Sequence, residues 1–260
     1  MAAACPPDLI ALAHRLADAS GAVIRRHFRT PFDIVEKADQ TPVTIADREA
    51  EEALRALIKQ ARPDHGIVGE EFGNEREDAR HVWVLDPIDG TGSFATGKPV
   101  FGTLIALLED DVPILGVIDQ PITGERWIGA RGHATTLNNK PVRTRPCPSL
   151  KAAWLDSTSP SLFAKADGEA FQRLAAATLR TRWGSDCYAY AVLATGFVDV
   201  VAEVGLKLYD FAALIPVVEG AGGVITDWTG RPLTRRSGGH VLAAGDARVH
   251  AEACRVLAGG

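Results

Sequence analysis

Apolar residues recur at helical spacing in the first part of the chain. Residues 8–29 place leucine, isoleucine, valine and alanine three or four positions apart, which predicts an amphipathic helix. A second helix is expected after Thr44 and up to about Arg62, because Thr44 and Asp47 fit the capping-box pattern and Pro63 interrupts the helical spacing. Asp47 would then lie in the first turn of this helix.

Short apolar and β-branched runs follow the second helix and are separated by turn residues, a pattern typical of strands. The predicted strands cover residues 66–69, 82–85, 101–108, 113–118 and 125–129. Because the later runs are joined by short turns, this half of the chain is expected to be an antiparallel meander.

From about Lys151 onward, strand and helix patterns alternate, which favours layered α/β structure. The strands are expected at 152–156, 198–202, 223–226 and 241–245, and the helices at 168–180, 187–195, 210–221 and 246–258. Residues 140–150 are rich in proline and arginine and mark a boundary. The sequence therefore predicts an α+β half over residues 1–145 and an α/β half over residues 146–260.

Composition narrows the classes of function. The 260 residues are 46% hydrophobic and 23% charged, which is ordinary for a globular protein with a large core. A formal net charge of −5 without a lysine or arginine cluster argues against nucleic-acid binding. The four scattered cysteines form no CxxC motif and suit a reducing cytoplasm. No signal peptide or membrane-spanning run is recognised, so we expect neither export nor a membrane partner.

The strand predicted at 82–85 runs directly into the sequence Asp-Pro-Ile-Asp-Gly-Thr. The proline and the glycine are expected to break the strand, so that Asp86 and Asp89 emerge at its C-terminal end, where ligands collect in layered α/β folds. Two neighbouring acids repel each other unless a cation neutralises them. We therefore predict a Mg²⁺ site for a phosphate ester, with further oxygen ligands from the Ile88 carbonyl and the Thr91 hydroxyl.

Further acids stand at the ends of other predicted elements. Glu70 and Glu71 close a strand, and Asp47 and Asp210 each open a helix. Mg²⁺ prefers six oxygen ligands and keeps several waters, so a few carboxylates suffice for a site with more than one metal. Each acid also has a simpler interpretation: Asp47 and Asp210 as helix caps, and Glu70 with Glu71 as a solvated turn.

Taken in order, these motifs resemble the inositol monophosphatase superfamily over nearly the whole chain. The motifs are Asp47, Gly69-Glu70-Glu71, Asp86-Pro87-Ile88-Asp89-Gly90-Thr91, Asp210-Phe211-Ala212-Ala213 and Glu219-Gly220-Ala221-Gly222-Gly223. Within the superfamily the chain is most similar to the histidinol-phosphatase branch. The segments that carry this similarity are Glu36-Lys37-Ala38-Asp39, Thr41-Pro42-Val43-Thr44, Phe101-Gly102-Thr103-Leu104, Ile118-Asp119-Gln120-Pro121, Gly124-Glu125-Arg126-Trp127 and Gly184-Ser185-Asp186-Cys187-Tyr188.

The resemblance implies an αβαβα five-layered sandwich and a phosphomonoesterase that uses two or three Mg²⁺ ions. The implied metal ligands are Glu70, Asp86, the Ile88 carbonyl, Asp89 and Asp210. Thr91, helped by Asp47, would polarise a metal-held water for in-line attack on phosphorus, and Glu70 or Glu71 would order a further metal and its waters.

The resemblance also implies a substrate site that reaches into the C-terminal half. The residues expected to contact substrate are Glu70, Ile88, Asp89, Gly90, Thr91, Gly92, Arg182, Asp186, Glu203 and Asp210. Amides of residues 90–92 would bind phosphate oxygens. Relatives in this branch often carry lysine or arginine at the position of Gly92, so this chain departs from the pattern there. Nearby Lys98 could replace the missing positive charge.

Histidinol phosphate carries an ammonium and an imidazole, which call for acids away from the metals. Asp186 and Glu203 are the candidates, although Asp186 could instead cap the helix at 187–195 and Glu203 could be a surface acid at a strand end. Arg182 is expected to contact the substrate or a neighbouring subunit.

The predicted function is hydrolysis of L-histidinol phosphate, a step of histidine biosynthesis, by a cytoplasmic homodimer. Three alternatives stay open. The first is the same chemistry on inositol 1-phosphate, a sugar bisphosphate or a 3′-phosphoadenosine nucleotide. The second is a haloacid-dehalogenase-type phosphatase, although its paired acids are separated by one residue and here Pro87 and Ile88 intervene. The third is a non-catalytic module that binds a metal or phosphate ester and regulates a partner.

Overall fold

The computed structural model describes residues 3–31, 35–36 and 42–260. Residues 37–39 of the motif at 36–39, and Thr41 of the motif at 41–44, lie outside the described residues. Two helices come first in the chain: α1 (Pro7–His27) and α2 (Ile45–Ala61). Both were predicted. The capping box is also confirmed, because the Thr44 side chain accepts a hydrogen bond from the backbone of Asp47 and the Asp47 side chain accepts one from the backbone of Thr44.

An eight-stranded sheet follows, in the order β10-β9-β8-β7-β6-β5-β3-β4. Its strands are β3 (Gly66–Gly69), β4 (Gly73–Glu75), β5 (His81–Asp89), β6 (Gly102–Glu109), β7 (Val112–Gln120), β8 (Glu125–Ala130), β9 (Thr136–Leu137) and β10 (Lys140–Pro141). The meander from β5 to β10 is antiparallel as predicted, but β3 pairs with β5 in parallel. A short pair, β1 (Val35–Glu36) and β2 (Pro42–Val43), and the helix α3 (Thr91–Ala95) complete this half.

The C-terminal half is built on a five-stranded sheet in the order β12-β11-β13-β15-β14. Its strands are β11 (Trp154–Ser157), β12 (Arg180–Trp183), β13 (Val200–Glu203), β14 (Val224–Thr226) and β15 (Val241–Ala244), and its helices are α4 (Lys165–Ala177), α5 (Tyr188–Ala194), α6 (Leu208–Phe211), α7 (Leu214–Gly220) and α8 (Ala247–Ala258). The division of the chain into two halves near residue 145 stays a prediction.

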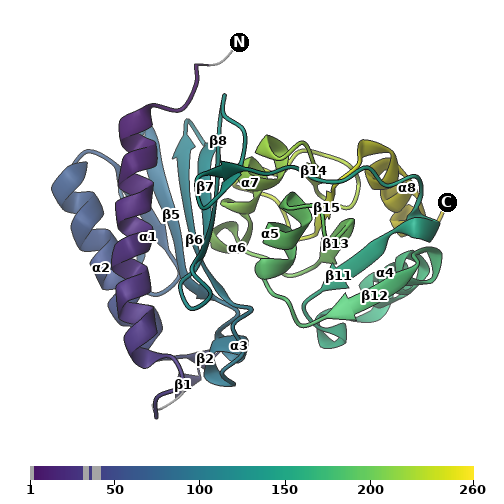
Figure 1. The fold of residues 1–260 in the computed structure, drawn as a ribbon, viewed down its shortest axis with the longest axis horizontal. Helices are drawn as coiled ribbons and strands as arrows, with labels where there is room; N and C mark the ends of the chain where they lie inside the picture. Colours follow the sequence, from purple (N-terminus) through teal and green to yellow (C-terminus); the bar gives the residue numbers. More distant parts are fainter. Residues whose placement is uncertain (1–2, 32–34, 37–41) are drawn as a thin grey trace.

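The layers run α, β, α, β, α, as Figure 1 shows from left to right. Helices α1 and α2 cover the outer face of the large sheet, and one apolar core lies between them, with Leu16 and Trp83 at its centre. A second core joins the inner face of the large sheet to α5, α6 and α7, and a third lies between the small sheet and α4 with α8. The predicted five-layered α/β sandwich is confirmed.

Two predicted boundaries are wrong, and both concern a proline. Strand β5 does not end before Pro87 but continues to Asp89, with an irregularity in its pairing to β6 between Asp86 and Asp89. The predicted helix at 210–221 is two helices, α6 and α7, because Pro216 has no N–H to bond the carbonyl of Ala212. The strand β12 was missed, since the preceding helix was expected to continue to residue 180.

The break between α6 and α7 lets backbone approach backbone in the central layer. A Cβ on Gly116 of β7 would lie 2.0 Å from the Ala213 carbonyl oxygen, and one on Gly129 of β8 would lie 2.0 Å from that of Pro216. These two glycines therefore set how closely α7 sits on the large sheet. Among the described residues, no helix has both the length and the apolar character needed to cross a bilayer.

We expect Gly116→Ala to lower the free energy of unfolding by about 1–3 kcal/mol, because the added methyl meets backbone rather than a movable side chain. Urea denaturation followed by circular dichroism measures this. Gly238→Ala is the matched control, because a Cβ there would meet no atom within 4 Å. Equal stabilities of the two variants would contradict this account of the central layer.

Candidate metal and substrate site

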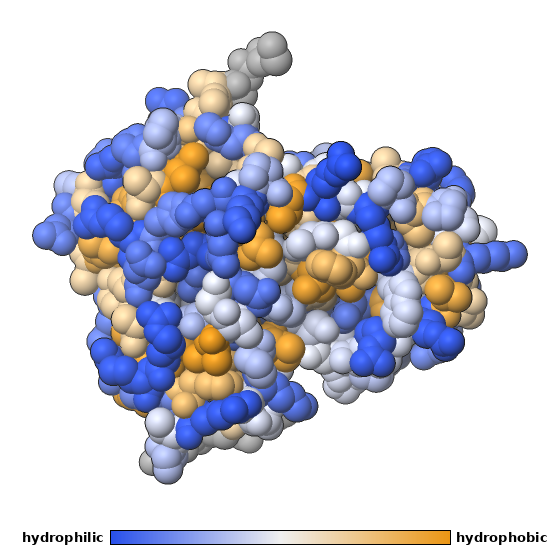
Figure 2. Space-filling model, in the orientation of Figure 1, coloured by the Kyte–Doolittle hydropathy of each residue, from blue (hydrophilic) through white to orange (hydrophobic). Residues whose placement is uncertain are grey.

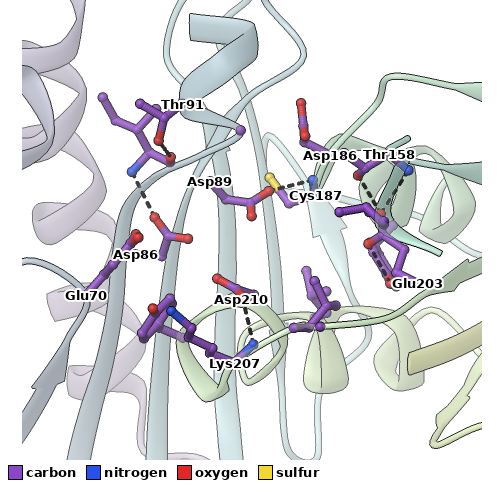
Figure 3. Close-up of a pocket in the computed structure, with 18 of the residues that line it drawn as sticks. Glu70, Asp86, Asp89, Thr91, Thr158, Asp186, Cys187, Glu203, Lys207 and Asp210 are labelled. Carbon is purple, nitrogen blue, oxygen red and sulfur yellow. Dashed lines mark hydrogen bonds between the residues drawn. The ribbon is translucent and has the colours of Figure 1, made fainter. Parts of the chain in front are cut away.

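A cavity of about 440 Å³ opens at the C-terminal end of β5, between the two halves of the chain. Polar and apolar side chains are interspersed on the face shown in Figure 2, and the outline is indented between the parts that carry α3 and β12. In Figure 3, Glu70 and Asp86 lie on one side of the cavity, Thr158 and Glu203 lie on the other, and Asp89 and Asp210 lie between them.

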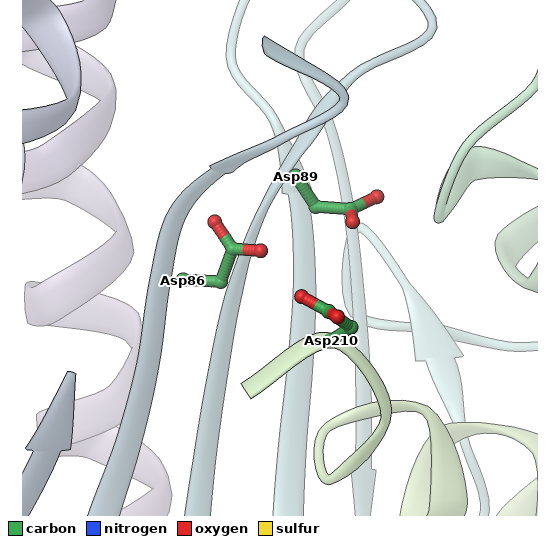
Figure 4. Close-up of side chains that lie close together, drawn as sticks. All are labelled: Asp86, Asp89 and Asp210. Carbon is green, nitrogen blue, oxygen red and sulfur yellow. The ribbon is translucent and has the colours of Figure 1, made fainter. Parts of the chain in front are cut away.

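Three of the predicted ligands form one cluster. Asp86 and Asp89 come from β5 and Asp210 comes from α6, and one carboxylate oxygen of each lies within 4.8 Å of the others (Figure 4). In a regular strand, positions three apart point to opposite faces. The irregular pairing between Asp86 and Asp89 lets both side chains face the cavity. Pro87 occupies this bulge, where no ladder hydrogen bond is required of it.

Burial and mutual repulsion act strongly on these acids. Burial raises the pKa of Asp86 well above its usual range, and the charges of Glu70, Asp89 and Asp210 raise it further. Burial likewise raises the pKa of Asp89, and it raises the pKa of Asp210 to about 7. Carboxylates in this arrangement are stable as anions only beside a cation. A hard divalent metal ion, which prefers carboxylate oxygens, fits this donor set.

Thr91 and Asp47 lie together beside the cluster of acidic side chains. The Thr91 hydroxyl donates to the Ile88 carbonyl at 3.1 Å and lies 3.4 Å from Oδ1 of Asp47. The other Asp47 oxygen, Oδ2, accepts from the Thr44 N–H at 2.8 Å and from the Thr44 hydroxyl at 2.6 Å. Asp47 therefore caps α2 with one oxygen and faces Thr91 with the other. Asp210 also has a capping role, since it accepts from the Lys207 N–H at 2.7 Å.

The segment after β5 turns sharply into α3. Gly90 has a φ of +86°, and a Cβ there would lie 2.8 Å from the Asp186 carboxylate, so glycine is required on both counts. The helix α3 begins at Thr91, and the N–H groups of its first turn have no partner within the helix. A Cβ on Gly92 would meet no atom within 4 Å, so a longer side chain would fit there.

Both candidate substrate acids line the cavity, and neither has the alternative role considered for it. Asp186 does not cap α5, because the N-cap is Cys187 and no side-chain cap is formed; its Oδ2 accepts from the Ser93 hydroxyl at 2.6 Å. Glu203 is not a surface acid, since it is only 3% exposed. Its carboxylate accepts from the N–H and hydroxyl of Thr158 and from the Tyr190 hydroxyl at 3.0 Å. Burial raises its pKa to about 7.

Arg182 does not line this cavity. It is exposed on β12, an edge strand, and its cross-strand neighbour is Asp156 on β11. The expected contact of Arg182 with substrate or with a neighbouring subunit stays a prediction. Three polar residues were not predicted from the sequence. Thr158 and Tyr190 line the cavity, and Ser93 donates a hydrogen bond to Asp186. No motif marks them, because their roles arise from partners far away in the sequence.

Comparison with known proteins identifies the family. A sequence model of the inositol monophosphatase family matches residues 7–258. The chain belongs to this family. Enzymes of this family use divalent metal ions, and its phosphatase members indicate that the chain is a phosphomonoesterase; the acidic cluster fits a divalent metal.

Individual members of the inositol monophosphatase family are similar over most of the chain. A solved inositol monophosphatase from Zymomonas mobilis is 50% identical, with a TM-score of 0.90 over 97% of this chain and 98% of that one. The bifunctional phosphatase IMPL2, chloroplastic, of Arabidopsis thaliana is 55% identical over 95% of this chain and 74% of its own length. A histidinol-phosphatase of Mycobacterium tuberculosis is 38% identical over 86% of this chain and 88% of its own.

The raised pKa of Asp210 predicts a pH-dependent stability of the metal-stripped protein. A carboxyl with a pKa of about 7 when folded and about 3.9 when unfolded binds more protons in the folded state between these values, so stability falls as pH rises through this window. We expect Asp210→Asn to be progressively more stable than the wild type as pH rises from about 4 to about 7.

Urea unfolding of both metal-stripped proteins across this window measures the difference. Groups that are the same in both proteins cancel in this comparison, such as buried His65 and His250, whose pKa values burial lowers. The difference reports Asp210 together with its effect on Asp86 and Asp89, whose pKa values the Asp210 charge raises. A difference in unfolding free energy that does not change with pH would refute the repulsion argued here. Added Mg²⁺ should stabilise the wild type more than Asp210→Asn.

Proposed function

We propose that the protein hydrolyses L-histidinol phosphate to L-histidinol and phosphate with Mg²⁺ as its cofactor. One observation carries the proposal: the cavity has carboxylates at both ends. Asp86, Asp89 and Asp210 crowd one end, and Asp186 and Glu203 stand toward the other. A substrate that carries a metal-binding phosphate on one side and cationic groups on the other matches this distribution of charge.

The groups proposed to hold Mg²⁺ are Glu70, Asp86, the Ile88 carbonyl, Asp89 and Asp210, which all line the cavity. When bound, two or three such ions supply a nucleophilic water and neutralise charge on the phosphate and on the departing alkoxide. The protein's own part is to place these oxygens on rigid elements and to keep their carboxylates ionised.

Thr91 and Asp47 are proposed to hold and orient the attacking water. The Thr91 hydroxyl lies between the Ile88 carbonyl and Asp47 Oδ1, so its proton has an acceptor on the protein and its lone pairs can receive a hydrogen bond from the water. Asp47 is 1% exposed and fixed by Thr44, which makes it a rigid acceptor. The Thr91 oxygen would take the proton that the water gives up in attack and would pass its own hydroxyl proton to Asp47 Oδ1.

Phosphate oxygens are proposed to meet the amides of Gly90, Thr91 and Gly92 at the start of α3. This contact would hold the phosphate at the end of β5, where Asp86 and Asp89 lie. The open space beside Gly92 leaves room for phosphate and water where relatives in the branch often carry a cation.

Specificity for histidinol phosphate is proposed to come from Asp186 and Glu203. A carboxylate offers about four lone-pair positions. Asp186 uses one oxygen for Ser93, and Glu203 accepts three hydrogen bonds, so each retains capacity for an ammonium or imidazole N–H. Similarity to histidinol-phosphatases supports this assignment. A homodimer with Arg182 at the subunit contact is proposed on the same resemblance.

Inositol 1-phosphate is the second candidate substrate. The solved relative at 50% identity is an inositol monophosphatase, and the same acids can accept hydrogen bonds from the hydroxyls of a neutral polyol. The ionisation of Asp186 decides between the two substrates, because a negative charge favours a cationic partner over a neutral one.

Phosphate release by the metal-stripped protein with added Mg²⁺ tests the proposal directly. L-histidinol phosphate, inositol 1-phosphate, fructose 1,6-bisphosphate and 3′-phosphoadenosine 5′-phosphate are compared at equal concentration. We expect Mg²⁺-dependent turnover that is highest on histidinol phosphate. Asp89→Asn should be inactive and controls for contaminating phosphatases. Faster turnover of another ester would reject the substrate assignment, and no turnover of any ester would reject the proposed activity.

The role of Asp186 predicts a selective defect in Asp186→Asn. Asparagine tolerates the positive φ of +45° at this position and can still accept from Ser93, so only the charge is lost. We expect kcat/KM for histidinol phosphate to fall about tenfold or more. Hydrolysis of a small phosphate ester whose alcohol part is uncharged, such as glycerol 2-phosphate, should change little. Equal losses on both substrates would remove Asp186 from the specificity role.

A further inference from the structure

Glu51 is a buried carboxylate that the proposed mechanism does not use. It lies on α2 between Asp47 and Arg55, at a spacing of four residues on either side, so the three charged side chains share one face of the helix. All three are buried, and Glu51 is 0% exposed. Burying a charge costs free energy unless it is paired and hydrogen-bonded. The groups that pair with Glu51 therefore indicate the role of this buried charge.

The Glu51 carboxylate binds the backbone directly after Glu70. Its Oε2 accepts from the Glu71 N–H at 2.8 Å, and its Oε1 accepts from the Phe72 N–H at 3.2 Å. On the other side, the Glu70 N–H donates to the Leu85 carbonyl of β5 at 3.2 Å. The turn that carries the Glu70 side chain is thus held both by the large sheet and by α2.

Arg55 neutralises Glu51 and extends the network to β4. Its Nε donates to Glu51 Oε1 at 2.7 Å, its Nη1 pairs with Glu75 at 2.9 Å, and its Nη2 donates to the Gly73 carbonyl. Lys59 on α2 also pairs with Glu75, at 2.8 Å. The backbone of residues 71–73 and the side chain of Glu75 are therefore tied to the same face of α2.

The Glu51 carboxylate lies so close to the backbone at position 69 that only glycine fits there. A Cβ at Gly69 would lie 2.0 Å from Glu51 Oε1 and 2.6 Å from Arg55 Nη2. Gly69 does not have a positive φ, so backbone conformation does not require glycine here. The requirement is steric, and it comes from Glu51 and its partner.

We propose that Glu51 is a positioning residue for the metal site: it fixes the backbone of residues 70–72 and thereby holds the Glu70 side chain beside Asp86 in the cavity (Figure 3). The inference rests on the metal site of the proposed function. Stability alone accounts poorly for the arrangement, because a buried ion pair is often replaceable by apolar residues without loss. An apolar side chain, however, cannot accept hydrogen bonds from two backbone N–H groups.

The test is the affinity of the metal-stripped protein for Mn²⁺, with the free ion followed by electron paramagnetic resonance. In Glu51→Gln the amide keeps the shape but has one acceptor oxygen for three donors, so at least one N–H of the turn is released. We expect Mn²⁺ binding to weaken about 10- to 100-fold, as for other groups that orient metal ligands. Circular dichroism should stay native. Glu52→Gln, the same change at the exposed next position, is the control and should bind as the wild type does.

A folded Glu51→Gln that binds Mn²⁺ as tightly as the wild type would overturn the inference and leave the proposed function intact. A wild type that binds no Mn²⁺ would instead reject the proposed metal site itself. Hydrogen exchange of the wild type provides a test that does not depend on the variant's folding. The Glu71 and Phe72 amides should exchange slowly in the metal-stripped protein, and exchange as fast as in an open turn would refute their capture by Glu51.

Discussion

Repulsion among buried carboxylates is the constraint on which this site depends. Asp86, Asp89 and Asp210 are brought within 4.8 Å of one another, and burial together with their neighbours raises their pKa values. The folded chain tolerates this arrangement because cooperative packing elsewhere is sufficient to hold it. A divalent cation would neutralise these charges, so the same repulsion favours the binding of a metal.

Each of the three acids is held in place by a helix or a strand. Asp86 and Asp89 are fixed by a bulge in a central strand, and Asp210 is fixed by the short helix α6. The same helix face of α2 that presents Asp47 to Thr91 also presents Glu51 to the turn after Glu70. A single helix thus orients both the residue pair proposed to hold water and the turn of a proposed metal ligand.

Sequence patterns predicted this framework because its signals are local. Helical spacing and the capping box found α1 and α2, and the acids at strand ends indicated the metal site before any fold was known. What the sequence did not reveal depends on distant partners. The bulge at Pro87 needs β6 to define it. Pro216 itself predicts a kink or a lost backbone bond in its helix, but only the fold shows that glycines of β7 and β8 lie against the break. Glu51 looked like an ordinary helix residue, because its backbone partners lie about twenty positions away.

The two ends of the cavity are not independent. Asp186 accepts from Ser93 on α3 and packs against Gly90, so the proposed specificity acid touches the segment proposed to bind phosphate. The next residue, Cys187, donates its N–H to Asp89 at 2.7 Å. A shift of this loop would therefore move a proposed metal ligand, the start of α3 and the proposed specificity acid together. A substrate that engages Asp186 would thereby also help to align the phosphate, and selectivity would appear in turnover as well as in binding.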